Sequence, residues 1–284
     1  MEHGKHLKVQ KQFIINMKTL ATTIRKNVYL TLGALSRKNS ENNNIVILCY
    51  HSVANDDWRF SVSFETLKQQ VEHLLQQRQA ISLEDLEQYL NGKLDINKPS
   101  FVITFDDGYK NILQTIPYFK EKGIKPTVFL LGNTEHADRY ELNNSLAFLT
   151  DEEILELHNA GWTLGVHSAT HADFRNLTKE SIQKEISVAK TNLEKALQVK
   201  MKYFSFPKGV YSKKILEEVK KAGYTMAVSM DDGFISKKTN KYTIPRVGVD
   251  ATHSIEEFKV LYSPMVTHFR GFMKQTPAAK YFAS

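Results

Sequence analysis

Seven short apolar runs alternate with helix-like segments along most of this 284-residue chain. The apolar runs span residues 45–51, 101–107, 126–131, 162–168, 203–207, 225–230 and 244–249. Helical patterns lie between them, at about 63–77, 83–91, 110–122, 151–160, 178–197, 212–222 and 254–262. Strands that are separated by helices pair in parallel through right-handed crossovers. The alternation therefore predicts an α/β fold, and the chain length favours a closed or nearly closed barrel over an open sheet.

Local signals mark the ends of several of these elements. The stretches TDEE at 150–153 and SIEE at 254–257 match the capping box, in which a hydroxyl and a glutamate satisfy free N–H groups at a helix start. Three glycines each follow a predicted helix and precede a predicted strand, as C-cap glycines do: Gly123, Gly161 and Gly223. These signals support the boundaries of the predicted helices.

The net positive charge of the chain lies in its first 40 residues. They contain eight Lys or Arg and one acid, a net charge of +7 that equals the charge of the whole chain. Apolar residues of this region recur at steps of three and four, which predicts one stripe of a helix: Phe13, Met17, Leu20, Ile24, Val28, Leu32 and Leu35. We expect a basic amphipathic helical arm and linker at 1–43 and a barrel domain at 44–284. The arm either packs on the domain or lies on an anionic membrane surface.

Targeting signals and cysteine content suggest where such a protein works. No run of about 18 apolar residues predicts a transmembrane helix. The basic start lacks the compact apolar core of a secretory signal, whereas a mitochondrial presequence stays open. The single cysteine, Cys49, excludes an intrachain disulfide and lies in an apolar run, which favours a small buried side chain over a nucleophile. We expect a cytoplasmic protein, or one peripheral on the inner face of the membrane, that does not bind nucleic acid.

Polar side chains follow four of the predicted strands. His51 ends the first strand, Asp106 and Asp107 end the second, His167 lies at the end of the fourth, and Lys208 follows the fifth. In parallel barrels the chemistry sits at the carboxyl ends of strands, so we expect these groups to converge at one mouth of the barrel.

The stretch HSATH places two imidazoles, His167 and His171, four residues apart. Two imidazoles and one carboxylate form a facial set of ligands for a divalent metal with open positions. The adjacent aspartates then have an explanation, because one carboxylate binds the cation and the other accepts a proton from a water acidified by the cation. A leaving amine also needs an acid, and His51 is the candidate.

At this point three stretches resemble the ordered motifs of a known family: TFDDGY at 104–109, HSATH at 167–171 and FSFPKGVYS at 204–212. They look like the motifs of the polysaccharide deacetylases, carbohydrate esterase family 4, also called the NodB-homology domain. The stretches 47–53 and 62–86 are similar to the branch that includes poly-N-acetylglucosamine deacetylases. The resemblance covers about residues 44–250. It implies a distorted (β/α)7 barrel that removes an N-acetyl group from an aminosugar of a polysaccharide or lipid-linked glycan.

The resemblance also implies residue roles. Asp106 matches the general base, Asp107 matches the metal-binding aspartate, and the imidazoles of HSATH match the metal histidines. His51 matches the catalytic acid of this branch, and His268 is the second candidate. The expected metal ion is Zn²⁺, and Co²⁺, Ni²⁺ and Mn²⁺ are the alternatives.

The third motif departs from the family pattern. It often reads Arg-x-Pro-Tyr-Gly, whereas this chain has Ser-Phe-Pro-Lys-Gly at 205–209. The backbone N–H of Lys208 keeps the expected role at the oxyanion, and its side chain is a candidate contact for an anionic substrate group. Arg246 is our candidate to orient Asp106, an exposed strand-end charge being the alternative. We expect Ser168 and Thr104 to position the metal ligands. We expect the side chains of three aromatic residues either to stack on sugar rings or to pack in the core or rim: Trp58, Tyr109 and Tyr211.

Three functions compete on these residues. The leading one is a metal-dependent aminosugar N-deacetylase. The second is a catalytically inactive carbohydrate-binding or adaptor protein on the same barrel, which has no need of both aspartates. The third is an iron oxygenase, which the adjacent second aspartate disfavours. The expected cytoplasmic location favours a nucleotide-linked or lipid-linked sugar over a finished extracellular polymer.

Overall fold

The computed structural model describes residues 20–36, 45–138, 142–277 and 279. The chain divides into two compact units. One, the barrel unit, spans residues 41–251, and the other, the helical unit, combines residues 1–40 with residues 252–284. The sequence assigned residues 252–284 to the barrel domain. In the structure this segment groups with the N-terminal region instead.

Eight parallel strands form the main sheet of the barrel unit among the described residues. One of them, β4, pairs only with β5, and the other seven follow the order β10-β1-β5-β6-β7-β8-β9. Each of these seven corresponds to one predicted strand: β1 (Ile45–Tyr50), β5 (Ser100–Phe105), β6 (Thr127–Leu130), β7 (Thr163–Val166), β8 (Tyr203–Ser205), β9 (Met226–Val228) and β10 (Val247–Gly248). Three two-residue strands were not predicted: β2 (Ser52–Val53), β3 (Ser61–Val62) and β4 (Gln79–Ala80). Strand β4 extends the edge of β5, and β2 pairs with β3.

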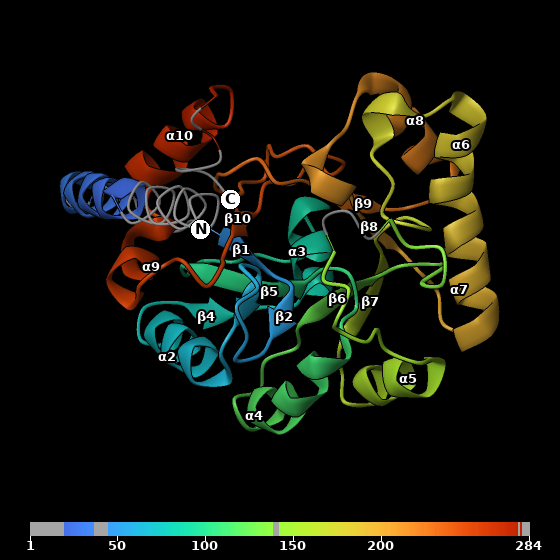
Figure 1. Ribbon diagram of the computed structural model, residues 1–284, viewed down its shortest axis with the longest axis horizontal. Coiled ribbons are helices and arrows are strands. Elements are labelled where there is room, and N and C mark those ends of the chain that lie inside the picture. The colour runs from blue at the N-terminus through green and yellow to red at the C-terminus, as the bar shows by residue number, and fades with distance from the viewer. Residues whose placement is uncertain (1–19, 37–44, 139–141, 278, 280–284) are drawn as a thin grey trace, which may run out of the picture. The chain divides into compact units, whose positions relative to one another are not determined.

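The sheet curls so that its two ends meet at one point. Ile244, just before β10, forms an isolated parallel bridge with Val228 of β9. The Ile244 N–H donates to the carbonyl of Ala227 at 3.0 Å, and the Ser229 N–H donates to the carbonyl of Ile244 at 2.8 Å. In Figure 1 helices α2, α4, α5, α6, α7 and α8 lie outside the strands. The predicted distorted barrel is therefore confirmed.

The predicted helices of the barrel unit are all present, with two irregular turns. They are α2 (Phe64–Leu75), α3 (Leu83–Leu90), α4 (Ile116–Glu121), α5 (Asp151–Asn159), α6 (Lys179–Gln183), α7 (Ala189–Leu197) and α8 (Lys213–Lys221). The predicted helix at 110–122 begins as a 3₁₀ helix, Lys110–Thr115. The predicted helix at 178–197 contains a π-helical turn, Lys184–Val188, of the kind that often marks a functional site. The capping box predicted at Thr150 is confirmed.

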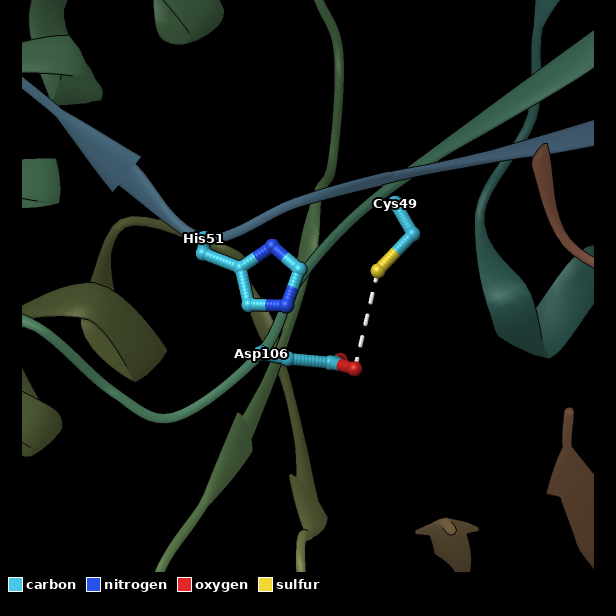
Figure 2. Close-up of side chains that lie close together, drawn as sticks. All are labelled: Cys49, His51 and Asp106. Carbon is cyan, nitrogen blue, oxygen red and sulfur yellow. Dashed lines mark hydrogen bonds between the residues drawn. The ribbon is translucent and has the colours of Figure 1, made fainter. Parts of the chain in front are cut away.

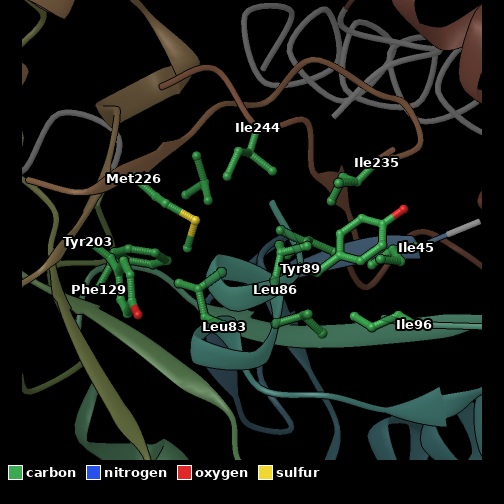
Figure 3. Close-up of a cluster of buried hydrophobic side chains, with 13 residues drawn as sticks. Ile45, Leu83, Leu86, Tyr89, Ile96, Phe129, Tyr203, Met226, Ile235 and Ile244 are labelled. Carbon is green, nitrogen blue, oxygen red and sulfur yellow. The ribbon is translucent and has the colours of Figure 1, made fainter. Parts of the chain in front are cut away.

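Helix α3 closes the amino-terminal end of the barrel interior. Its side chains Leu83, Leu86 and Tyr89 form one buried cluster with inward-facing strand residues such as Ile45 and Phe129. Figure 3 shows these α3 side chains facing the strand residues. Burial of apolar surface on this scale is the main favourable term of folding, so this layer holds the barrel together.

The inward faces of the strands become polar toward their carboxyl ends. Side chains on a strand alternate with a period of two, so every second residue points into the barrel. Cys49 lies two residues after Ile47, and Thr104 lies two residues after Val102, with Asp106 next in the same series. All five are buried. An apolar layer therefore lies beneath a buried polar layer within the same barrel.

The helical unit contains a helix over residues 20–36, called the arm helix here, together with α9 (Ile255–Leu261) and α10 (Pro264–Met273). The arm helix packs within this unit through residues spaced four, four and three apart: Arg25, Tyr29, Gly33 and Ser36. Arg25 Nε donates to the buried Glu257 Oε1 at 3.0 Å. A Cβ at Gly33 would lie 2.4 Å from Cβ of Val260, so glycine allows the helix to approach α9.

The apolar stripe predicted for the arm is not its packing face. Leu20, Ile24 and Leu35 are 55%, 46% and 49% exposed. Ile24 and Leu35 each precede a buried residue and so lie about 100° around the helix from the packing face. Phe13 and Met17 lie outside the described residues. Within the described ranges, none of the helices combines the length and the hydropathy that crossing a bilayer requires.

Replacement of Gly165 tests the packing of the barrel interior. A Cβ at this position of β7 would lie 2.5 Å from the Phe129 ring and 3.2 Å from the carbonyl oxygen of Tyr203. Gly165→Ala is therefore expected to lower the free energy of unfolding by about 1–3 kcal/mol, the usual cost of overpacking, as measured by urea denaturation. Gly233→Ala is the control, because its Cβ would meet Pro245 at an ordinary 3.4 Å. An unchanged midpoint for Gly165→Ala would contradict the close packing.

Candidate metal centre and active site

The loops that follow β1, β5, β7 and β8 carry the polar residues that the sequence placed at the barrel mouth. The described residues include five non-glycine positions with a left-handed backbone, and four of them lie in these loops: Asp107 (φ 72°), Ser168 (69°), His171 (62°) and Lys208 (57°). Such conformations cost about 1–3 kcal/mol each and persist where the surrounding structure requires them. Their clustering marks these loops as a functional site.

Asp107, His167 and His171 form a compact group of metal-ligand type. One ligand atom from each side chain lies within 4.8 Å of the others, and all three residues are buried. Asp107 Oδ1 lies 3.5 Å from His167 Nε2 and 3.6 Å from His171 Nε2. Tetrahedral ligands at about 2.0–2.2 Å from a zinc ion lie about 3.4 Å apart, so the observed separations fit such an ion. The three groups can hold a divalent cation.

Both imidazoles of this group are prepared to act as neutral ligands. His167 Nδ1 donates to the carbonyl of Ser205 at 2.9 Å, which places the proton on Nδ1 and leaves the lone pair of Nε2 facing Asp107. Burial lowers the pKa of His167 and lowers that of His171 well below its ordinary value. A metal binds imidazole only in the deprotonated form, so these surroundings favour metal binding at neutral pH.

Glu185 holds the loop that carries His171, a role that was not predicted from the sequence. This buried carboxylate accepts hydrogen bonds from the N–H of Ala169 at 3.0 Å, from the N–H of Thr170 at 2.9 Å and from the Thr170 hydroxyl at 2.7 Å. Ser168 Oγ accepts from the His171 N–H at 3.0 Å, in line with the expected positioning role. Glu185 lies in the π-helical turn. The sequence feature that could have identified it is an acidic residue at a core-facing position of the predicted helix.

Asp106 forms a buried ion pair with Arg246. Arg246 Nη1 donates to Asp106 Oδ1 at 2.7 Å and Nη2 donates to Oδ2 at 2.6 Å. Burial by itself would raise the pKa of Asp106, but the guanidinium outweighs burial and holds that pKa below its ordinary value. The carboxylate therefore stays ionised and oriented. Arg246 is fully buried, so the alternative of an exposed strand-end charge is wrong.

Three further side chains fix this pair. Ser205, at the position of the missing motif arginine, donates from Oγ to Asp106 Oδ2 at 3.2 Å. Thr104 Oγ1 accepts from Arg246 Nη1 at 3.1 Å, so it positions the arginine rather than a metal ligand. Cys49 Sγ donates to Asp106 Oδ2 at 3.5 Å, and burial raises the pKa of this thiol well above its ordinary value. Cys49 is thus a protonated buried side chain, as predicted, and a weak donor as well.

His51 lies close to the carboxylate of Asp106, the candidate base. His51 and Cys49 are two residues apart, and Figure 2 shows both directed toward Asp106. One ligand atom each of Cys49, His51 and Asp106 lies within 4.8 Å of the others. Enclosure by the protein lowers the pKa of His51 to about 4. The imidazole is therefore neutral at neutral pH.

The adjacent aspartates have different surroundings. Asp106 points to a guanidinium and two weaker donors, whereas Asp107 points to two neutral imidazoles. The left-handed backbone at Asp107 turns the chain between them. Asp106 is thus available as a proton acceptor and Asp107 as a metal ligand. From the sequence, only the family resemblance assigned these two roles to the individual aspartates.

The remaining candidates are placed less centrally. Lys208 Nζ lies 3.5 Å from Asp173 Oδ2, so a protein carboxylate already meets the charge that we considered for an anionic substrate. His268 is exposed on α10 in the helical unit and belongs to neither cluster of metal-ligand type among the described residues. The structure therefore favours His51 over His268 for contact with the base.

The three aromatic candidates differ in exposure. Tyr109 is fully buried between Trp58, at a ring distance of 5.2 Å, and Phe148, also at 5.2 Å. It is therefore a packing residue. Trp58 is partly buried, and Tyr211 is 36% exposed with its hydroxyl donating to Asp231 at 2.7 Å. These two rings remain accessible to a ligand.

Comparison with known proteins gives the geometry a family context. Residues 93–227 match the family model described as polysaccharide deacetylase. A segment of 172 residues is 27% identical to the poly-beta-1,6-N-acetyl-D-glucosamine N-deacetylase of Staphylococcus aureus and makes up 56% of this chain and 57% of that protein. The chain therefore spans little more than half the length of this relative.

Solved structures of low sequence identity share the fold. The deacetylase PplD of Streptococcus pyogenes, in complex with acetate, aligns with a TM-score of 0.65 and 20% identity over 78% of this chain and 99% of that chain. IcaB from Ammonifex degensii aligns with a TM-score of 0.64 and 20% identity over 81% of this chain and 98% of that chain. Both matches establish the architecture of the barrel.

Removal of one imidazole tests the metal group. His171→Ala is expected to weaken Zn²⁺ binding by at least about 100-fold in isothermal titration calorimetry, because one of three protein ligands is lost. His136→Ala is the matched control, since His136 is an exposed loop histidine outside both clusters. Equal Zn²⁺ affinity of His171→Ala and wild type would rule out the assigned ligand set.

Histidines that the fold keeps neutral make the metal-free protein sensitive to acid. Below the ordinary histidine pKa of 6.5, His51 gains a proton in the unfolded chain but keeps its pKa of about 4 in the fold. The unfolded state then binds more protons than the folded state. As the pH falls from 6.5 to about 4, this histidine therefore lowers the free energy of unfolding by about 1.4 kcal/mol for each pH unit. His51→Gln should therefore show a shallower loss of stability than wild type in urea denaturation with chelator. Identical pH slopes would contradict the neutral imidazole.

Proposed function

Because the chain belongs, through residues 93–227, to the polysaccharide deacetylase family, we propose that it is a metal-dependent hydrolase of aminosugar N-acetyl groups. The glycan is proposed to be a polysaccharide or a lipid-linked sugar. The proposed ion is Zn²⁺, since two imidazoles and a carboxylate at tetrahedral separations suit it. The observation that carries the proposal is a carboxylate within the metal group next to a second carboxylate outside it.

A cation held by Asp107, His167 and His171 would polarise the acyl carbonyl and lower the pKa of a nearby water. Asp106 accepts the proton that the water loses. Its carboxylate is ionised at neutral pH because Arg246 pairs with it, and the pair also fixes its orientation. A base that is already oriented loses little entropy in the reaction.

His51 is proposed to deliver the proton to the leaving nitrogen. With a pKa of about 4, it begins the cycle as a neutral imidazole. The proton balance allows a neutral His51. Hydrolysis of the amide adds one proton to the leaving nitrogen, and the attacking water releases one proton. His51 lies within 4.8 Å of the Asp106 carboxylate and so is placed to relay that proton. The relay requires no acid that is charged at the start.

The backbone at Lys208 is proposed to stabilise the oxyanion. Lys208 and Gly209 both have left-handed conformations, with φ of 57° and 68°. Within this tight turn after β8 the Gly209 N–H donates to the carbonyl of Phe206 at 2.9 Å. The N–H proposed to face the oxyanion is that of Lys208, and an N–H aimed at developing charge is worth about 3–4 kcal/mol. Only the backbone is needed, so a lysine is compatible with this position.

The substrate is proposed by analogy with one relative. The Staphylococcus aureus protein is named for poly-beta-1,6-N-acetyl-D-glucosamine. We therefore propose β-1,6-linked N-acetylglucosamine oligomers as the first substrate to test and a lipid-linked acetylated aminosugar as the second. The decisive assay is acetate release from both, with added Zn²⁺ and with chelator. Release that persists after complete metal removal, or no release from either substrate class, would overturn the proposal.

Separate substitutions test the assigned roles. Asp106→Asn is expected to retain Zn²⁺, because Asp106 is outside the metal group, and to lower kcat at least about 100-fold through loss of the base. Asp57→Asn, an exposed neighbouring carboxylate, is the control. His51→Ala should lower kcat by a similar factor while His268→Ala leaves it unchanged. Full activity of His51→Ala together with an inactive His268→Ala would reassign the acid.

A further inference from the structure

The helical unit combines exposed apolar side chains with a net positive charge that the barrel unit lacks. Eight large apolar side chains are exposed among the described residues, and five of them lie in this unit: Leu20, Ile24, Leu35, Met265 and Phe272. The unit provides only a small part of the described residues, so exposed apolar surface is strongly enriched there. Monomeric proteins rarely leave such surface without a partner.

The two helices that carry these side chains contact each other. The Met265 N–H donates to Ser36 Oγ at 3.0 Å, which places the start of α10 at the end of the arm helix. The rings of Tyr29 and Phe269 lie 6.3 Å apart, at a point earlier in the arm helix and later in α10. The helices therefore run antiparallel, and their apolar residues belong to one packed structure.

The apolar residues of each helix share a face. On α10, Met265 and Phe272 are seven residues apart, which is two turns, and are 38% and 62% exposed. On the arm helix, Leu20 and Ile24 are one turn apart. The packing of the arm helix uses a different face, built around Arg25 and Tyr29, so folding of the unit leaves the apolar faces uncovered.

The charge of the unit indicates its partner. Residues 1–40 and 252–284 contain twelve Lys or Arg and three acids, a net charge of +9. Residues 41–251 contain 26 Lys or Arg and 28 acids, a net charge of −2. Of the five basic residues of this unit that the structure describes, Arg25 and Arg270 are buried and the other three are not. Apolar side chains and positive charge together match the surface of an anionic bilayer, to which each basic residue adds about 1 kcal/mol.

We propose that the helical unit docks the protein on an anionic membrane surface, with the apolar side chains of the arm helix and α10 entering the interface between headgroups and acyl chains. A second copy of the chain would cover apolar surface but would be repelled by the same positive charge. A nucleic acid would neutralise the positive charge, but its phosphate backbone would not bury exposed leucine, isoleucine and phenylalanine side chains. This docking is independent of the proposed hydrolysis.

Sedimentation with vesicles tests the docking on the full-length protein. Vesicles of phosphatidylcholine with about one-third phosphatidylglycerol are compared with pure phosphatidylcholine, at low and high salt. Wild type is expected to sediment with the anionic vesicles, and high salt should weaken this. Sedimentation with neither kind of vesicle, or equally with both, would overturn the proposal.

Three substitutions test the apolar contribution: Ile24→Gln, Leu35→Gln and Phe272→Gln. The triple variant is expected to lose at least about tenfold in partition coefficient, because each side chain contributes buried apolar area. The matched control is Leu94→Gln with Val188→Gln, which are 37% and 46% exposed in the barrel unit. Circular dichroism establishes folding, and the single variants Ile24→Gln and Phe272→Gln provide independent measurements if the triple variant misfolds.

Two outcomes would assign the surface differently. Unchanged partitioning of the triple variant would leave charge alone as the cause and overturn the apolar docking. A wild-type dimer in gel filtration that the triple variant converts to monomer would show that a second copy covers the face, and would also overturn the proposal. Acetate release from a soluble oligomer, measured in the same preparations, reports the proposed function separately, because its assay contains no membrane.

Discussion

The buried ion pair between Asp106 and Arg246 is the interaction on which the polar half of the barrel depends. Taking either charge out of water alone costs several kcal/mol, and removing one partner of such a pair costs about 3–5 kcal/mol. The two hydrogen bonds of 2.7 and 2.6 Å offset that cost only while both side chains keep their positions. Asp106 follows β5 and Arg246 precedes β10, with β1 between them in the sheet, so the pair spans a strand.

This constraint links the fold to the site. The same inward faces that carry Ile47 and Val102 in the apolar layer carry Cys49, Thr104 and Asp106 above it. A sheet with period-two alternation can build both layers at once, because each strand crosses from one to the other. Helix α3 closes the apolar end, which leaves the carboxyl ends of the strands as the accessible end. The catalytic candidates therefore lie in the loops that leave the carboxyl ends of these strands, anchored by the sheet.

The adjacent aspartates of the opening motif show why a local sequence is not enough to assign roles. Their side chains belong to different networks, since Arg246 orients Asp106 and two imidazoles face Asp107. The strained turn at Asp107 separates them. Glu185 in the π-helical turn then supports the histidine loop from outside the barrel. The site is thus held from several strands and one helix, and few of these supports are adjacent in sequence.

The sequence by itself determined the seven strands, their helices and the residues that bear the chemistry, because periodicity, caps and strand-end position are local properties. It also indicated Arg246 as a partner of Asp106, although it left open an exposed charge. Only the tertiary structure decided that pairing, since the two residues are 140 positions apart. The same holds for Glu185 and for the arm helix, whose packing face is the polar Arg25 side and not the apolar stripe. Contacts between distant residues select such partners, and no local pattern records them.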